Sequence, residues 1–125
     1  MSREPRKKLL VLDDDAGVVD FLCESLAERG FDATGFRSPT DALARIKAES
    51  FDLVITDVEM PNMDGFTLTT RIRQDARYRE LPIILVTSLA SDEHRRQGIE
   101  AGANAYVTKN TFDQKALLDT LRRLV

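Results

Sequence analysis

Residues 8–30 read KLLVLDDDAGVVDFLCESLAERG and contain one complete strand–turn–helix unit. The run at residues 9–12 is continuously apolar, which is typical of a parallel strand that is covered on both faces. Three aspartates follow it. Beyond them, apolar residues recur at i, i+3, i+4 and i+7, namely Val19, Leu22, Cys23 and Leu26. This spacing predicts an amphipathic helix, and Gly30 is the residue type that commonly ends one.

An apolar run followed by an amphipathic stretch occurs five times in the chain. The runs lie at residues 9–12, 31–36, 53–55, 83–86 and 105–107. Three of them are almost continuously apolar, as expected for central parallel strands. The second run alternates with the polar residues Asp32 and Thr34, which predicts an edge strand.

Helix signals fill the intervals between these runs. Ser38 before Pro39 is typical of a helix start, and Thr111 with Gln114 has the spacing of a capping box. Strands and helices that alternate at this length predict a doubly wound α/β fold with right-handed crossovers. We therefore expect a five-stranded parallel sheet with five helices.

Length, charge and cysteine content predict the number of domains, the class of partner and the cellular compartment. A chain of 125 residues with 42% hydrophobic residues suits one domain, and we expect a disordered lead-in at residues 1–7 and the domain at residues 8–125. The net charge of -3 gives no support for nucleic-acid binding. Cys23, the single cysteine, is expected to be a small buried hydrophobic residue and favours a reducing compartment. No apolar run approaches the ~18 residues of a membrane span, so we expect a cytoplasmic protein without membrane insertion.

Polar side chains stand at the ends of four predicted strands. Asp13 and Asp14 follow the first, Asp57 follows the third, Thr87 ends the fourth and Lys109 follows the fifth. In doubly wound sheets, ligands bind outside the carboxyl ends of the strands. The sequence therefore predicts that carboxylates, a hydroxyl and an ammonium group converge at one edge of the sheet.

Such a cluster has a definite chemistry. Carboxylates brought together repel one another unless a cation or protons intervene, and Mg²⁺ takes oxygen ligands while keeping room for phosphate oxygens. A carboxylate left partly free could attack phosphorus and form an acyl phosphate, whose formation Lys109 and the metal would assist. Asp15 could belong to this site or cap the next helix, and Tyr106 could belong to it or pack in the core. Asp64 with Gly65 predicts a turn that begins the third helix.

Four segments and one lysine, taken in order, resemble the receiver domains of two-component response regulators. The segments are VLDDD (11–15), DLVITDVEMPNMDG (52–65), PIILVTS (82–88) and GANAY (102–106), and the lysine is Lys109. At this spacing they form a specific signal that spans about residues 8–124. The resemblance implies the flavodoxin-like receiver fold.

The resemblance also implies the roles of the acidic residues. Asp57 stands at the phosphoacceptor, which receives its phosphoryl group from a phosphohistidine on a sensor histidine kinase or a phosphotransfer protein. Asp13 and Asp14 match the acidic pair that holds Mg²⁺, for which Mn²⁺ is an acceptable substitute. The backbone carbonyl of Glu59 matches a further metal ligand.

Three other positions match the parts of the family that respond to phosphorylation. Thr87 matches the hydroxyl that closes on the phosphoryl oxygens, Lys109 the cation that pairs with them, and Tyr106 the switch aromatic. In the family, the face made by the fourth helix, the fifth strand and the fifth helix then changes its affinity for a partner protein. We expect a signalling protein that catalyses only its own phosphorylation and dephosphorylation and is not otherwise an enzyme.

Asn110 departs from the family pattern, in which a proline after a cis bond usually follows the lysine. A cis bond before a non-proline residue costs ~3 kcal/mol, so the isomer of the Lys109–Asn110 bond stays open. Residues 109–114 are similar to receivers that work with chemotaxis-type histidine kinases. The chain ends at the fifth predicted helix, so we expect output through a partner or through the rest of a longer protein.

Three alternative functions remain open from the sequence. A haloacid-dehalogenase-like phosphatase also forms an aspartyl phosphate with Mg²⁺, and residues 57–59 resemble its paired acids, but its nucleophile normally follows the first strand. Steady turnover of a phosphate ester would favour it. A flavodoxin-like flavin domain would need a hydroxyl- and glycine-rich loop where this chain has three aspartates, and a colourless protein would count against it. A pseudo-receiver would act through protein contacts alone. His94 is expected to be a surface residue, not a phosphodonor or ligand.

Overall fold

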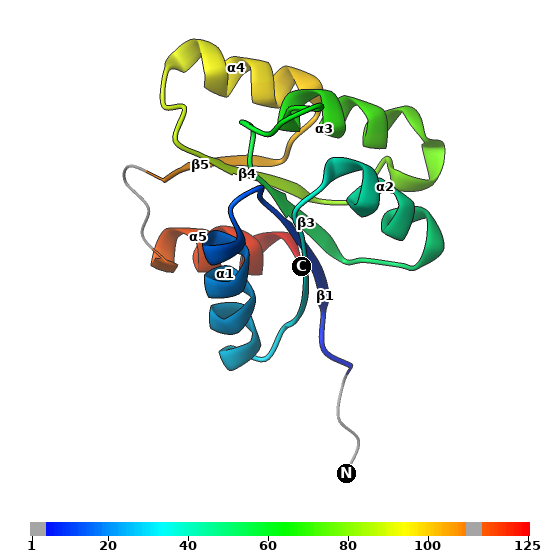
Figure 1. The fold of residues 1–125 in the computed structure, drawn as a ribbon, viewed down its shortest axis with the longest axis vertical. Coiled ribbons are helices and arrows are strands. Elements are labelled where there is room, and N and C mark those ends of the chain that lie inside the picture. Colours follow the sequence, from blue (N-terminus) through cyan, green and yellow to red (C-terminus); the bar gives the residue numbers. More distant parts are fainter. Residues whose placement is uncertain (1–4, 110–113) are drawn as a thin grey trace.

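The computed structural model describes residues 5–109 and 114–125, which form one sheet of five parallel strands (Figure 1). The strands are β1 (Lys8–Leu12), β2 (Asp32–Phe36), β3 (Leu53–Thr56), β4 (Ile83–Thr87) and β5 (Ala105–Thr108). Their order is β2-β1-β3-β4-β5. Leu12 pairs with Phe36 on one side and with Thr56 on the other, so the carboxyl ends of the three strands lie level. The predicted doubly wound parallel sheet is confirmed.

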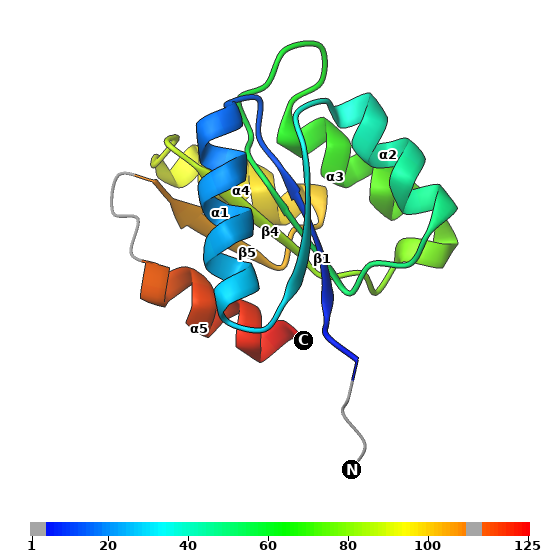
Figure 2. The same ribbon diagram turned by 60° about the horizontal axis from the view of Figure 1, so that its bottom comes forward.

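Five α-helices in the described residues connect the strands and cover both faces of the sheet. They are α1 (Ala16–Glu28), α2 (Pro39–Ala48), α3 (Gly65–Gln74), α4 (Asp92–Ala101) and α5 (Gln114–Leu124). Helices α1 and α5 lie on one face, and α2, α3 and α4 lie on the other (Figures 1 and 2). A short 3₁₀ turn, η1 (Ala76–Tyr78), follows α3 and is not predicted by the sequence.

Alternate residues of the central strands fill two hydrophobic cores. Leu9 and Val11 of β1 pack in the core under α1 and α5, whereas Leu10 and Leu12 pack in the core under α2 and α3. Strands β3 and β4 are buried at every residue, which explains their continuous apolar runs. Strand β2 is only partly buried and lies at the edge of the sheet, as predicted.

The helix ends follow the predicted signals where the structure describes them. Gly30 comes after the last residues of α1 with a φ of 90°, a conformation that glycine adopts without a steric penalty. Ser38 accepts a hydrogen bond from the backbone N–H of Asp41, and Pro39 is the first residue of α2. The predicted capping box of Thr111 and Gln114 depends on side chains outside the described part.

The expectation for Cys23 needs adjustment. Cys23 is only partly buried and packs at the margin of the core under α1, where burial raises the pKa of its thiol and the nearby Asp20 adds to the rise. Of the expected lead-in, residues 1–4 lie outside the described part, and residues 5–7 precede β1 without regular secondary structure. Among the described residues, no helix has the length and apolar character needed to cross a membrane.

Candidate functional site

Asp13 and Asp57 lie side by side because β1 and β3 are neighbours in register. The backbone N–H of Asp13 donates to the carbonyl of Phe36 (3.2 Å), and that of Asp57 donates to the carbonyl of Leu12 (3.0 Å). These bonds hold both aspartates at the carboxyl edge of the sheet. Asp13 is 3% exposed and Asp57 is 7% exposed. Together with Asp14, they offer carboxylate oxygens that all lie within 4.8 Å of one another.

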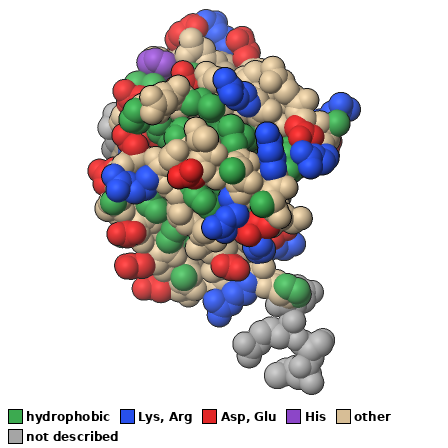
Figure 3. All heavy atoms as spheres, turned by 45° about the vertical axis from the view of Figure 1, so that its right-hand side comes forward, with side chains coloured by type: hydrophobic (Ala, Val, Ile, Leu, Met, Phe, Trp, Pro, Cys, Tyr) green, Lys and Arg blue, Asp and Glu red, His purple; other side chains and the backbone are tan. Residues whose placement is uncertain are grey.

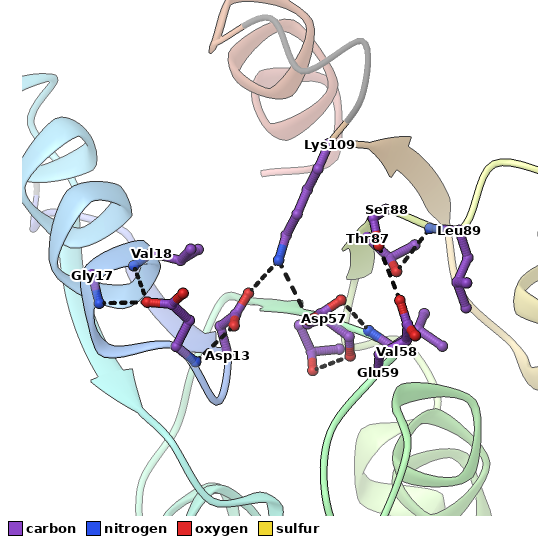
Figure 4. Close-up of polar contacts among 12 residues, drawn as sticks. Asp13, Gly17, Val18, Asp57, Val58, Glu59, Thr87, Ser88, Leu89 and Lys109 are labelled. Carbon is purple, nitrogen blue, oxygen red and sulfur yellow. Dashed lines mark hydrogen bonds and ion pairs between the residues drawn. The ribbon is translucent and has the colours of Figure 1, made fainter.

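Lys109 brings a cation to these carboxylates from the end of β5. Its backbone N–H donates to the carbonyl of Thr87 (2.7 Å), which anchors the residue beside β4. Its Nζ lies 2.7 Å from Oδ2 of Asp13 and 3.4 Å from Oδ2 of Asp57 (Figure 4). The structure thus brings four of the predicted site residues into one cluster, with one ammonium group between the acids of two strands.

The charges in the cluster are not balanced. Burial raises the pKa of Asp57; Lys109 and the Val58 N–H act in the opposite direction, while the Asp13 carboxylate adds to the rise. Burial alone would lower the pKa of Lys109, but its contacts with Asp13 and Asp57 outweigh burial, so this pKa is raised. Lys109 therefore stays protonated at neutral pH, whereas its surroundings stabilise the Asp57 carboxylate only in part. A further cation would correct this deficit.

The donor set fits a hard divalent cation. The cluster of Asp13, Asp14 and Asp57 supplies three carboxylates against one ammonium group, which leaves negative charge in excess. Mg²⁺ prefers oxygen ligands and keeps several of its waters, so two buried carboxylates with the less buried Asp14 suit it better than a fully enclosed site would. The peptide carbonyl of Glu59 follows two residues after Asp57 and is a further oxygen on the same loop.

Gly65 allows α3 to begin directly against the backbone that carries Asp57. Its N–H donates to the carbonyl of Val58 (2.8 Å). A Cβ at this position would lie 2.3 Å from the carbonyl oxygen of Asp57, a distance that no side chain could accept without a backbone shift. Asp64 caps the helix by accepting a hydrogen bond from the N–H of Thr67 (2.8 Å). The turn predicted for Asp64 and Gly65 therefore also fixes the position of Asp57.

Asp15, whose role was open, and His94, which was expected at the surface, both lie outside the acidic cluster. Asp15 caps α1, because its Oδ1 accepts hydrogen bonds from the N–H groups of Gly17 (2.8 Å) and Val18 (3.3 Å). His94 is partly exposed on α4, where its Nδ1 lies 2.7 Å from Oγ of Ser91. The cluster of possible metal ligands found among the described residues includes neither.

Thr87 and Tyr106 act on the same residue of the loop between β4 and α4. Thr87 is fully buried, and its Oγ1 accepts a hydrogen bond from the N–H of Leu89 (3.3 Å). The hydroxyl of Tyr106 donates to the carbonyl of Leu89 (2.6 Å). The Tyr106 ring lies against α4 at Gly98, where an added Cβ would come within 2.9 Å of the ring. The ring is therefore set by both the loop and the helix.

The sequence does not predict two contacts at the rim of the site. The hydroxyl of Ser88 donates to Oε1 of Glu59 (2.9 Å), and Nε of Arg37 donates to the carbonyl of Asp14 (3.3 Å). Each contact joins two loops that follow different strands, so no local pattern could have revealed it. The only sequence signal was a hydroxyl directly after Thr87 and a carboxylate two residues after Asp57.

A groove of about 650 Å³ lies beside the site, between the loop after β3 and the start of α4. Its lining includes Glu59, Met60, Phe66, Leu89 and His94. Figure 3 shows hydrophobic side chains gathered on this side of the molecule, next to its single histidine. The groove places the Glu59 side chain at the border between the acidic cluster and an apolar surface.

A family model of the response regulator receiver domain matches residues 9–122. The chain belongs to this family. The membership, with the five parallel strands in the order described above, confirms the predicted receiver fold. It also decides between the alternatives left open above, in favour of a receiver and against the phosphatase and the flavin domain.

Known receivers share both the fold and the sequence pattern. The structure of the chemotaxis protein CheY4 of Vibrio cholerae matches with a TM-score of 0.90 and 30% identity, over 97% of this chain and 100% of that one. The transcriptional regulator RpaA of Synechocystis is 31% identical over 124 residues, which are 94% of this chain and 48% of that protein. The gliding motility regulatory protein of Myxococcus xanthus is 37% identical over 84 residues.

The receiver spans only part of these curated relatives. The matched segment is 11% of the Myxococcus protein and about half of the Synechocystis protein. The family therefore describes the domain, and the activities of those longer proteins belong to them.

Proposed function

We propose that this receiver accepts a phosphoryl group on Asp57 from a phosphohistidine, carried by a histidine kinase or a phosphotransfer protein, in a Mg²⁺-dependent reaction. The observation that carries the proposal is the convergence of three carboxylates and the Lys109 ammonium at one edge of the sheet. A purely structural role would not call for two buried aspartates whose charges are incompletely neutralised.

The transfer needs little from the protein beyond position and charge. An oxygen of the Asp57 carboxylate attacks the phosphorus atom, a P–O bond forms, and the P–N bond to the donor imidazole breaks. The imidazole nitrogen leaves with the electron pair and takes a proton from water. No general base is required, because Asp57 attacks as a carboxylate. Oδ1 of Asp57 accepts a hydrogen bond from the Val58 N–H (2.7 Å). The candidate nucleophile is therefore Oδ2 of Asp57, which faces Lys109.

The metal and Lys109 would together stabilise the negative charge of the phosphoryl group. When bound by Asp13, Asp14, Asp57 and the Glu59 carbonyl, Mg²⁺ (or Mn²⁺) would neutralise charge on the transferring group. Lys109 sits between Asp13 and Asp57 and can pair with a phosphoryl oxygen without leaving the cluster. Its positive charge stabilises the negative charge of the phosphoryl group both during transfer and in the phosphorylated product.

The phosphoryl group then drives the switch through Thr87 and Tyr106. It adds about -1.5 to -2 charges and three acceptor oxygens. A change from 1:99 to 99:1 in the active population needs ~5.5 kcal/mol, and two charge-assisted hydrogen bonds, from Thr87 and Lys109, would supply ~1.5–3 kcal/mol each. We therefore expect a partial shift, which moves Leu89, the Tyr106 ring and the face made by α4, β5 and α5.

The wider setting follows from the same proposal. The receiver would act in the cytoplasm, change its affinity for a partner protein through the α4–β5–α5 face, and have no direct contact with nucleic acid. Its catalysis would be limited to its own phosphorylation and dephosphorylation.

Incubation with acetyl phosphate and Mg²⁺, followed by intact mass spectrometry, tests the proposal. We expect the wild type to gain one phosphoryl group that is stable in acid and labile in base. Asp57→Asn should gain none. Asp15→Asn is the matched control: it changes a neighbouring aspartate outside the cluster to a residue that caps helices equally well, so it should be labelled. Equal labelling of Asp57→Asn would overturn the assignment, and no labelling of the wild type would favour a pseudo-receiver.

A further inference from the structure

The loop between β4 and α4 is held from two sides in this structure. From β5, the Tyr106 hydroxyl donates to the carbonyl of Leu89 (2.6 Å). From the loop after β3, Oε1 of Glu59 accepts a hydrogen bond from the hydroxyl of Ser88 (2.9 Å; Figure 4). Ser88 stands between Thr87 and Leu89, so Glu59 holds the residue that joins the other two contact points of this loop.

The Thr87 hydroxyl is not bonded to the acidic cluster in this state. Its oxygen accepts from the N–H of Leu89, and no hydrogen bond joins it to Asp57 among the described residues. The switch proposed above moves Leu89 together with the Tyr106 ring, and Ser88 lies directly before Leu89 in the chain. The Ser88–Glu59 bond is 2.9 Å long, and hydrogen bonds are lost beyond ~3.5 Å, so a shift of the Ser88 hydroxyl by roughly 0.6 Å away from Glu59 breaks it.

Charge acts in the same direction as geometry. Glu59 follows Asp57 by two residues, and its carboxylate faces the loop across the mouth of the site. A phosphoryl group on Asp57 adds about -1.5 to -2 charges close to this carboxylate, and like charges repel. Both Glu59 and Ser88 are exposed, so their bond is weak enough to be broken by such a change.

We propose that the Glu59 side chain is a positioning residue that holds the β4–α4 loop in its resting conformation through Ser88, and that loss of this bond is part of the response to phosphorylation. This role is separate from that of the Glu59 backbone carbonyl at the metal site. The inference rests on the proposed phosphorylation of Asp57. It predicts that removing the bond favours the active conformation.

A double-mutant cycle with beryllofluoride, a phosphoryl analogue, tests the inference at saturating Mg²⁺. The readouts are the beryllofluoride concentration at half-saturation and the NMR signal of the Tyr106 amide. Ser88→Ala should lower the midpoint roughly threefold to tenfold, the value of one hydrogen bond. In a Glu59→Ala background, the effect of Ser88→Ala should be clearly smaller than in the wild type. In a Glu59→Gln background, the amide oxygen still accepts from Ser88, so the effect of Ser88→Ala should return.

Controls separate this role from general damage and from failure of the site. Ser50→Ala removes an exposed hydroxyl next to the end of α2, far from the loop, and should leave the midpoint unchanged. Thermal unfolding establishes that each variant is folded. An unchanged or raised midpoint in Ser88→Ala, or an equal effect in the Glu59→Ala background, would overturn the positioning role. In either case, intact mass would still show phosphorylation of Asp57 if the proposed function holds. Failure of the wild type both to bind beryllofluoride and to take up a phosphoryl group would overturn both.

Discussion

Replacing Gly65 by alanine would place a methyl group against the backbone that carries Asp57. The added Cβ would lie 2.3 Å from the Asp57 carbonyl oxygen, whereas ordinary contact begins near 3.4 Å, so the start of α3 must move by 3.4 - 2.3, or about 1 Å. Overpacking of this kind costs ~1–3 kcal/mol, and the better helix propensity of alanine returns at most ~1 kcal/mol. We expect a net loss of about 1–2 kcal/mol. With an unfolding entropy near 2.1 cal/mol/K per residue, this lowers Tm by roughly 4–8 °C.

Thermal unfolding by circular dichroism measures this loss, and labelling by acetyl phosphate measures its effect on the site. The matched control is Gly17→Ala, near the start of α1, where the nearest atom to an added Cβ is a side-chain oxygen of Asp15 at 3.2 Å. That oxygen caps α1 and needs to shift by only about 0.2 Å to reach ordinary contact, so Gly17→Ala should change Tm little. Gly65→Ala should melt earlier and be labelled more slowly. If Gly65→Ala melted within about 1 °C of the wild type and were labelled at the same rate, α3 would not position Asp57.

Three further predictions concern charge, metal binding and hydrogen bonding. Because burial raises the pKa of Asp57, the folded protein keeps a proton that the unfolded chain loses above pH ~3.9, so the free energy of unfolding falls as pH rises through this window. Without metal, Asp57→Asn should therefore be more stable than the wild type at pH 7, and the difference should shrink towards pH 4. Denaturant unfolding in EDTA measures this difference. A variant that is less stable than the wild type at pH 7 would contradict the prediction. Mg²⁺ at 100 times its Kd should stabilise the wild type by ~2.7 kcal/mol, and an equal gain in Asp13→Asn, seen by thermal shift, would exclude Asp13 as a ligand. Arg73→Ala removes the donors to the carbonyls of Gly102 (3.0 Å) and Tyr78 (2.8 Å) and to Oδ1 of Asn104 (2.9 Å). The variant should therefore lose about 2–4 kcal/mol of stability. Its folded fraction should still be labelled by acetyl phosphate at the wild-type rate.

The parts of the fold that depend on local pattern are predictable from the sequence. The continuous apolar runs of β1, β3 and β4 indicate strands buried on both faces, and the alternating polar residues of β2 indicate the edge. The short turn η1 is capped locally by Asp75, whose Oδ1 accepts from the Arg77 N–H (3.0 Å), but it also depends on groups outside the turn. Arg73 donates to the carbonyl of Tyr78, and the Tyr78 hydroxyl donates to the carbonyl of Ile46 (3.1 Å). Nothing in a three-residue segment reveals such partners.

The functional site likewise has a part that the sequence predicts and a part that it does not. Asp13, Asp57 and Lys109 are predictable because the ends of parallel strands meet at one edge, so their positions along the chain imply proximity. The bond between Glu59 and Ser88 depends on how two loops curve towards each other, and sequence spacing does not determine that. The close approach at Gly65 was visible only as a turn, because the sequence does not show which backbone lies behind the glycine.

In the proposed mechanism, Asp57 itself receives the phosphoryl group. Peptide mapping by tandem mass spectrometry tests it most directly, after reaction with phosphoramidate, whose P–N bond resembles that of phosphohistidine, and digestion in acid. We expect one phosphoryl group on Asp57, and its loss from the map when Mg²⁺ is removed with EDTA. A phosphoryl group found on Asp13, Asp14 or Thr87 instead, or labelling of Asp57 that is unaffected by EDTA, would contradict it.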